Sequence, residues 1–354
     1  MINGIQHIGI GVSDRDASYR FYNDAMDFSV PLSKNTGNCT GMLPVIEHDE
    51  ERNVVIALNP YGGGLIEIFQ YITKNPVPPK EYDFSSNGYL FFGLKVRNIK
   101  ASIEIIKNHG GEIITDSDNS DKFELAVKDF TPMKSSGWKT AIFRDVDGIY
   151  GILLEYPESS IGYGNGRPRI GGVEYVAIGV SNLETSMEFY TNVMGYRKIL
   201  YRAEGNFPEW DVLFGKGRKM KRALLMRDRK PEGIFKHFLR GGMIELIEVE
   251  GNNGRHIYEG RKWGDIGFME LCFDVTDIDE TLKDVTSKGA KIIVPSYKQD
   301  MGMNTHATFA YIEDPDGSML EFADVHRLPV PYFFIRTLVN PPIIHFAKKI
   351  GIIK

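Results

Sequence analysis

The chain contains an internal repeat, which constrains its fold more strongly than any local propensity does. Residues 4–28 (GIQHIGIGVSDRDASYRFYNDAMDF) align without a gap with residues 172–196 (GVEYVAIGVSNLETSMEFYTNVMGY). The identical positions include Gly11 and Gly179 in the apolar part, and Ser13 and Ser181 directly after it. Each copy predicts an apolar strand, a serine N-cap and then an amphipathic helix.

A second pair of similar segments alternates with the first pair. Residues 90–114 and 269–293 each predict a strand, a capped helix that ends at Gly110 or Gly289, and a new strand. Each half later reaches an acidic turn and a last strand. The order is therefore A-B-A′-B′, and the repeating unit is one strand, one helix and then several strands.

The spacing of the repeat sets the expected domain boundaries. Pro-, Gly-, Ser- and Asn-rich stretches at 72–87 and 157–171 are typical of linkers. We expect two pairs of modules and a C-terminal arm, over residues 1–156, 172–326 and 327–354. The arm is interpreted as a segment that packs on the body or on a partner subunit, with a membrane-surface helix as the alternative. Prolines at 341–342 break any long helix there.

Composition narrows the classes of function. The 354 residues are 42% hydrophobic and 25% charged, which is typical of a folded globular protein. A formal net charge of −5 and the lack of a basic stripe argue against a nucleic-acid partner. Two cysteines, Cys39 and Cys272, fit a reducing compartment, so we expect a cytoplasmic protein. No apolar stretch is long enough to span a membrane, and the sequence leaves a homodimer open.

The four modules, with HIGIGV near the start, DPDGSMLEF near the end and a glutamate in each last strand, resemble the vicinal oxygen chelate superfamily. This superfamily includes glyoxalase I, extradiol dioxygenases, bleomycin-resistance proteins and several epimerases. The resemblance implies an α+β fold of four βαβββ modules, in which paired modules form two cup-shaped domains. It also implies a divalent metal ion inside a cup, bound by residues of the first and last strands of two paired modules.

The resemblance places candidate ligands at eight positions of this chain. The first-strand positions hold His7, Phe91, Tyr175 and Glu270, and the last-strand positions hold Glu67, Glu155, Glu245 and Glu321. If neighbouring modules pair, neither cup has a normal site. If the first module pairs with the fourth, one cup collects His7, Glu67, Glu270 and Glu321, and the other collects the remaining four. This complete set favours the pairing of the first with the fourth module.

One imidazole and three carboxylates suit a divalent ion such as Mn²⁺, Fe²⁺, Co²⁺, Ni²⁺ or Zn²⁺. Such an ion would bind adjacent oxygens of a small substrate and favour an enediolate, with Glu67 or Glu321 as the base. We therefore predict a metal-dependent epimerase or isomerase of a hydroxy-carbonyl compound, similar in size and module number to epimerases of valiolone-type keto-cyclitols. The alternatives are an extradiol-type dioxygenase with atypical ligands and a non-catalytic binding protein.

His306 precedes the last strand of the fourth module, and strand alternation makes it a candidate for contact with the substrate. Each of these residues also has a purely structural interpretation. A buried histidine such as His7 is more often a satisfied core residue than a ligand. A glutamate inside an apolar strand is harder to explain in this way, because an unpaired buried carboxylate is costly.

Overall fold

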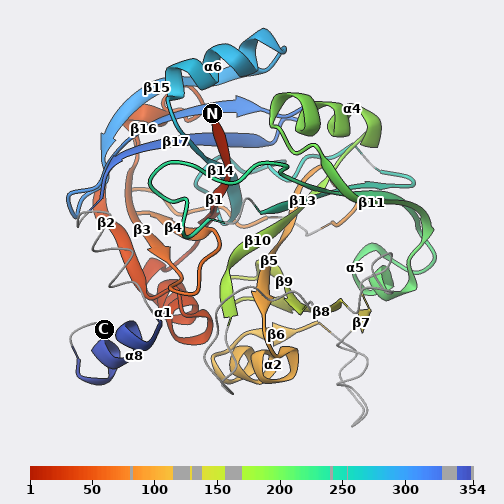
Figure 1. Cartoon of the computed structure of the whole chain (residues 1–354), viewed down its shortest axis with the longest axis horizontal. Helices are drawn as coiled ribbons and strands as arrows, with labels where there is room; N and C mark the ends of the chain where they lie inside the picture. The colour runs from red at the N-terminus through yellow and green to blue at the C-terminus, as the bar shows by residue number, and fades with distance from the viewer. Residues whose placement is uncertain are drawn as a thin grey trace.

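The computed structural model (Figure 1) describes residues 1–79, 83–114, 128–129, 138–155, 170–239, 242–252, 254–328 and 341–351. The predicted linker 157–171 lies outside these residues up to position 169, and the predicted arm lies outside them at 329–340 and 352–354. In the described parts, no helix has both the length and the apolar character that a membrane crossing requires.

The strand and helix order predicted from the repeat is present in all four modules. The first two modules contain β1 (Ile2–Gly11), α1 (Arg15–Met26), β2 (Val30–Asn38), the short helix η1 (Thr40–Met42), β3 (Glu51–Leu58) and β4 (Leu65–Tyr71), and then β5 (Gly88–Val96), α2 (Ile99–Asn108), β6 (Glu112–Ile113), β7 (Lys128–Asp129), β8 (Lys139–Arg144) and β9 (Tyr150–Glu155).

The third module contains β10 (Ile170–Gly179), α4 (Leu183–Glu188) with the π-helical turn η3 (Phe189–Val193), β11 (Lys198–Asn206), η4 (Pro208–Trp210), α5 (Asp211–Phe214), β12 (Lys219–Met226) and β13 (Met243–Val249). The fourth contains β14 (Gly267–Val275), α6 (Ile278–Ser287), β15 (Lys291–Asp300), β16 (His306–Glu313) and β17 (Met319–Arg327). The helix α8 (Pro341–Lys349) follows.

The strands form two curled sheets, and their order settles which modules pair. The first sheet runs β15-β16-β17-β14-β1-β4-β3-β2, and the second runs β11-β12-β13-β10-β5-β9-β8-β6, with β7 on β8. Figure 1 shows the C-terminal strands β16 and β17 beside the N-terminal strands of the first sheet. The first module thus pairs with the fourth and the second with the third, through the antiparallel pairs β1–β14 and β5–β10. We call the two sheets the first and the second cup.

This topology separates the sequence repeats from the spatial domains. The predicted ranges 1–156 and 172–326 each hold two modules, but each range gives one module to each cup. The junction between the ranges is close-packed. Gly64 and Val173 exchange backbone hydrogen bonds of 2.7 and 2.8 Å, and a Cβ atom on Gly172 would lie 2.4 Å from the Gly64 carbonyl oxygen.

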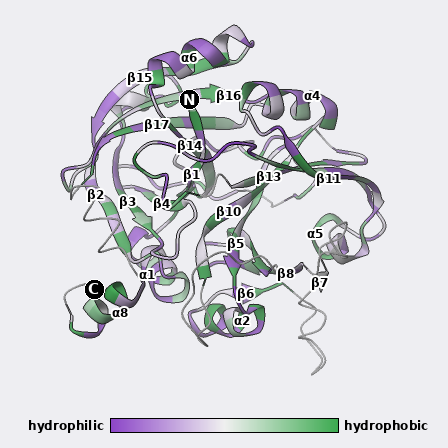
Figure 2. Cartoon of the chain, in the orientation of Figure 1, coloured by the Kyte–Doolittle hydropathy of each residue, from purple (hydrophilic) through white to green (hydrophobic). Residues whose placement is uncertain are grey.

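One hydrophobic core joins the two cups. It contains residues of all four modules, including Ile8, Phe92, Val176 and Leu271. Hydrophobic and hydrophilic residues alternate round α2, α4 and α6 (Figure 2), as expected of helices with one buried face. The side chain of Tyr22 on α1 donates a hydrogen bond of 2.5 Å to Asp145 of the second module, which ties the helix of one cup to the other cup.

The helix ends differ slightly from the prediction. Asp14 and Asn182 are the N-caps of α1 and α4, because their side chains accept hydrogen bonds from backbone N–H groups of the first turn. The predicted caps Ser13 and Ser181 each precede the true cap by one residue. Gly110 and Gly289 follow α2 and α6 with φ of 93° and 94°, so their predicted role after the helix end is confirmed.

The helix α8 contacts the first module. Its His345 lies 3.5 Å from a carboxylate oxygen of Asp27 and 3.4 Å from the hydroxyl of Tyr61. The prolines at 341–342 stand at the start of this helix, where proline is well tolerated.

Candidate metal centre

The four central strands of the first cup each carry one residue of the predicted ligand set. Following the sheet through β17, β14, β1 and β4, these residues are Glu321, Glu270, His7 and Glu67. Gly9 lies opposite Glu270 on β14 and opposite Glu67 on β4 in the strand register. The structure therefore brings together four side chains that are up to 314 positions apart in the sequence.

The four side chains converge on one point. His7 Nε2 lies 3.0 Å from a carboxylate oxygen of Glu67 and 3.1 Å from one of Glu321. One ligand atom from each of the four residues lies within 4.8 Å of all the others. His7 Nδ1 lies 3.2 Å from the amide oxygen of Gln6, and this contact holds the ring with Nε2 toward the carboxylates.

Three carboxyl groups and one imidazole are concentrated in this cluster. Burial and the negative charges of Glu67 and Glu321 raise the pKa of Glu270 well above its usual range. Burial lowers the pKa of His7, but its contacts with Glu321 and Glu67 outweigh this effect and raise the pKa to about 10. Glu270 Oε1 is buried and accepts no hydrogen bond from the described residues, and the contact of the buried Glu321 Oε2 is with His7. A divalent cation would compensate these oxygens, so the residues fit a metal ion.

Two further side chains hold the carboxylates in place. The indole Nε1–H of Trp263 donates a hydrogen bond to Glu270, and the hydroxyl of Tyr311 donates one of 2.7 Å to Glu321 Oε1. Each bond engages one oxygen of its carboxylate. The other oxygen of each group is therefore oriented toward the centre of the cluster.

The lack of a side chain at Gly9 leaves space for the carboxylate of Glu270. A Cβ atom at this position would lie 1.9 Å from Glu270 Oε1. The absence of a side chain there allows Glu270 to extend over β1 toward His7.

Cys272 is a poorer ligand than the three glutamates. It lies opposite Glu321 on β17, and its thiol forms a second candidate group with His7 and Glu321. Burial raises the pKa of the thiol well above its usual range, which favours the neutral form rather than the thiolate that binds metals.

A hollow in the first cup connects with the cluster. Its empty volume of about 400 Å³ includes space that is open to solvent. Glu67 and Glu321 line it together with the aromatic residues Phe69, Trp263, Tyr297, Phe309 and Tyr311. A ligand in this hollow could contact both glutamates.

The second cup holds an ion pair at the corresponding depth. The Arg222 guanidinium contacts Glu245 Oε1 through Nε at 2.7 Å and through a terminal nitrogen at 2.6 Å, and both side chains are fully buried. The hydroxyls of Tyr175 and Tyr201 also donate to Glu245. The ring of Trp210 lies 4.5 Å from the centre of the guanidinium. Glu245 is thus satisfied by side chains of the protein itself.

The predicted position of Glu155 requires a correction. Glu155 accepts a hydrogen bond of 2.7 Å from the backbone N–H of Ile99, the first residue of α2. Gln70, Glu248 and Asp324 accept the same bond from the first residues of α1, α4 and α6. These residues stand three positions after Glu67, Glu245 and Glu321. The counterpart of Glu67 in the second module is therefore Ile152, which lies opposite Gly93 as Glu67 lies opposite Gly9.

The structure does not bring His306 into the cluster. His306 begins β16, and the residues of β16 that line the hollow are Phe309 and Tyr311. Side chains alternate between the two faces of a strand, and His306 is an odd number of positions from both of these residues. His306 is consequently not among the described residues that line the hollow.

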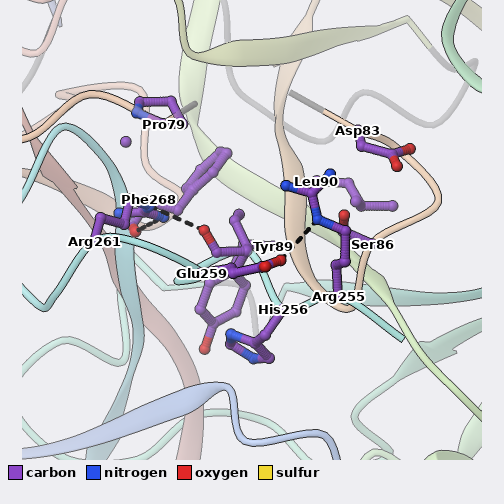
Figure 3. Close-up of a pocket in the computed structure, with 12 residues that line it drawn as sticks. Pro79, Asp83, Ser86, Tyr89, Leu90, Arg255, His256, Glu259, Arg261 and Phe268 are labelled. Carbon is purple, nitrogen blue, oxygen red and sulfur yellow. Dashed lines mark hydrogen bonds and ion pairs between the residues drawn. The ribbon is translucent and has the colours of Figure 1, made fainter. Parts of the chain in front are cut away.

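A second hollow lies where β5 and β14 begin (Figure 3). It has an empty volume of about 530 Å³. Arg255 and Arg261 stand on opposite sides of Tyr89, and Arg255 is paired with Glu259 at 2.7 Å. The clusters of ligating side chains found among the described residues lie in the first cup and not in this hollow.

Comparisons with known proteins agree with this architecture. The family model described as the Glyoxalase/Bleomycin resistance protein/Dioxygenase superfamily matches residues 4–150 and 172–322. None of the curated proteins compared with the chain matches its sequence.

Two solved structures are similar over most of the chain. Glyoxalase I from Zea mays is 16% identical with a TM-score of 0.53, over 91% of this chain and 92% of the maize chain. A "putative dioxygenase" from Bacillus subtilis is 13% identical with a TM-score of 0.57, over 94% of this chain and 87% of that chain. At these identities the similarity concerns the fold.

Proposed function

Because this chain belongs to the glyoxalase/bleomycin resistance protein/dioxygenase superfamily, we propose that its first cup is the active site of a metal-dependent isomerase or epimerase. The substrate is a small hydroxy-carbonyl compound with adjacent oxygens, of the keto-cyclitol or sugar type. The single observation that carries the proposal is the position of Glu67 and Glu321 on either side of His7, both lining the same hollow.

In this proposal His7, Glu67, Glu270 and Glu321 hold one divalent ion. Nitrogen and oxygen ligands in this ratio suit Mn²⁺, Fe²⁺, Co²⁺, Ni²⁺ or Zn²⁺. When bound, the ion would polarise the substrate carbonyl and make the neighbouring C–H bond more acidic. Glu270, which Trp263 holds and which is not among the described residues of the hollow, serves as a ligand only.

Glu67 and Glu321 differ in how firmly they are held. Tyr311 fixes Glu321 by a hydrogen bond, whereas the described contact of Glu67 is with His7. Glu67 is therefore the freer carboxylate and the better candidate for the first proton transfer. The two groups come from β4 and β17, which flank β1 and β14 on opposite sides. One carboxylate can take a proton from one face of a carbon atom, and the other can return a proton to the opposite face.

Deuterium exchange tests this function before the natural substrate is known. The protein, loaded in turn with each candidate metal, is incubated in D₂O with small hydroxy-ketones, and loss of the C–H signal is followed by NMR. We expect exchange with the wild type and with the surface control Glu104→Gln, because Glu104 is exposed on α2. We expect at least a hundredfold slower exchange in Glu67→Gln and Glu321→Gln, in line with the loss of a general base.

The same preparations separate the alternatives. Oxygen uptake with catechols would show dioxygenase chemistry, although Glu270 stands where the iron dioxygenases of the superfamily have a histidine. Ligand binding without exchange or oxygen uptake would show a binding protein. Either result would contradict the proposed isomerase.

A further inference from the structure

Arg52 is a buried cation on the wall of the proposed active site. It stands on β3 with 5% of its surface exposed, and it lines the same hollow as Glu67 and Glu321. Its Nη1 donates a hydrogen bond of 2.6 Å to the amide oxygen of Asn35 on β2. Among the described residues, neither an ion pair nor a second hydrogen bond is found for its guanidinium.

A buried arginine without an acidic partner is costly, because the charge has left water without compensation. The second cup shows one way of compensating such a charge, since the buried Arg222 is paired with Glu245. The acceptor described for Arg52 is the neutral amide oxygen of Asn35 and not a carboxylate. The planar guanidinium presents paired N–H groups that match a carboxylate or a phosphate.

The strand register places Arg52 apart from the metal ligands but on the same face. Ile56 lies opposite Glu67, and Arg52 lies opposite Tyr71, four positions further along β4. The two side chains share the concave face because strand positions alternate. Four positions correspond to about 13 Å between Cα atoms along the strand. A substrate that contacts both groups therefore has its adjacent oxygens at one end and an anionic group several bonds away.

We infer that Arg52 binds a carboxylate or phosphate group of the substrate, and that the substrate is an anionic hydroxy-carbonyl compound. This inference rests on the proposed function of the first cup, whose substrate class it narrows. It also explains why a cup lined by carboxylates has a cation on its wall, since Arg52 would be compensated only when the ligand is bound.

The competing explanation is that Arg52 serves only to join β2 to β3 through Asn35. That role would stabilise the strand pair and would not distinguish anionic from neutral ligands. The variant Arg52→Gln separates the two explanations, because glutamine can still donate a hydrogen bond to Asn35 but carries no charge. Arg20, which is exposed on α1, provides the matched control Arg20→Gln.

The test compares probes that differ in one anionic group. Dihydroxyacetone is paired with dihydroxyacetone phosphate, and hydroxyacetone is paired with δ-hydroxylevulinate. Their affinities for the metal-loaded protein are measured by titration calorimetry. We expect the wild type and Arg20→Gln to bind at least one anionic probe roughly 10- to 100-fold more tightly than its neutral partner. We expect Arg52→Gln to lose this preference and to retain its affinity for the neutral probes and its metal content.

Equal affinities of wild type and Arg52→Gln for both anionic probes would overturn the inference. The result is independent of turnover. An anion preference that depends on Arg52, without deuterium exchange, would support the anion site and contradict the isomerase. Deuterium exchange, together with an unchanged affinity of Arg52→Gln for the anionic probes, would support the isomerase and contradict the anion site.

Discussion

The ion pair of the second cup gives a prediction whose size follows from its burial. Arg222 and Glu245 are both fully buried, and Arg222 Nε donates to Glu245 Oε1 at 2.7 Å. The hydroxyls of Tyr175 and Tyr201 complete the environment of the carboxylate. The perturbations are Arg222→Met, Glu245→Gln and the double variant, which replace the charges with neutral side chains of similar size.

Each single substitution leaves one charge buried without its partner. Breaking a buried pair in this way costs about 3–5 kcal/mol, whereas replacing both partners by neutral groups is often close to neutral. We therefore expect each single variant to lose about 3–5 kcal/mol of unfolding free energy. We expect the double variant to lie within about 2 kcal/mol of the wild type.

Urea unfolding monitored by tryptophan fluorescence measures these changes where they occur. Trp210 packs against the Arg222 guanidinium, and Trp138 lies in the same hydrophobic cluster, so two of the three tryptophans report on this cup. Metal content is measured on the same samples. It should remain unchanged in all three variants, because the candidate ligands lie in the other cup.

Additive losses in the double variant would refute the reasoning, because they would mean that the two charges do not stabilise each other. Loss of metal from the single variants while they remain folded would also refute it, because the second cup would then take part in binding the ion.

Three further predictions concern the candidate centre and the junction of the cups. Trp263→Phe removes the hydrogen bond to Glu270, so metal affinity measured by competition with a chelator should fall by about 10- to 100-fold; unchanged affinity would exclude a role for this bond. Gly9→Ala places a Cβ atom 1.9 Å from Glu270 Oε1, so metal affinity should fall by a factor of roughly 10 or more while the protein stays folded, and full affinity would show that Glu270 is not a ligand. Burial raises the pKa of Asp145 to about 7. Between about pH 4 and pH 7 the folded protein therefore holds a proton that the unfolded chain has released. The unfolding free energy consequently falls as pH rises through this range, by at most about 1.4 kcal/mol per pH unit from this group. Asp145→Asn removes this contribution, and its unfolding free energy relative to wild type should increase from pH 5 to pH 8; a constant difference would contradict the assignment.

Much of this architecture can be predicted from the sequence, because the repeat gives the order of strands and helices in each module. The first-strand positions of the modules identify His7 and Glu270 as candidate ligands, and the apolar last strands identify Glu67 and Glu321. The complete ligand set in one combination also predicts that the first module pairs with the fourth, which the sheet order confirms.

The misplacement of Glu155 has a specific cause. A glutamate in the last strand can stand at the candidate ligand position, or three positions later, where it accepts a hydrogen bond from the first residue of the module's helix, as Glu155 does. Gln70, Glu248 and Asp324 show that every module has a polar residue at the cap position. Alignment of all four last strands on this second polar position would have identified Ile152 as the counterpart of Glu67.

Other residues of the two cups carried no signal of this kind. Trp263 belongs to a connecting segment and not to a repeated strand, so its contact with Glu270 depends on how that segment folds over the sheet. Arg52 and Arg222 lie on middle strands of their modules, and the sequence does not show whether a charge on such a strand faces solvent or the cup. His306 was predicted from alternation alone, but it stands three positions before Phe309 and five before Tyr311, so alternation along β16 places it on the face opposite these two residues of the hollow.

The most direct test of the central claim is the position of the metal in crystals. Crystals grown with Mn²⁺ or Zn²⁺ are measured at wavelengths on either side of the absorption edge, and an anomalous difference map locates the ion. We predict one strong peak per chain, between His7, Glu67, Glu270 and Glu321. A peak at Glu245 in the second cup, or no peak among the four residues at saturating metal, would contradict the account.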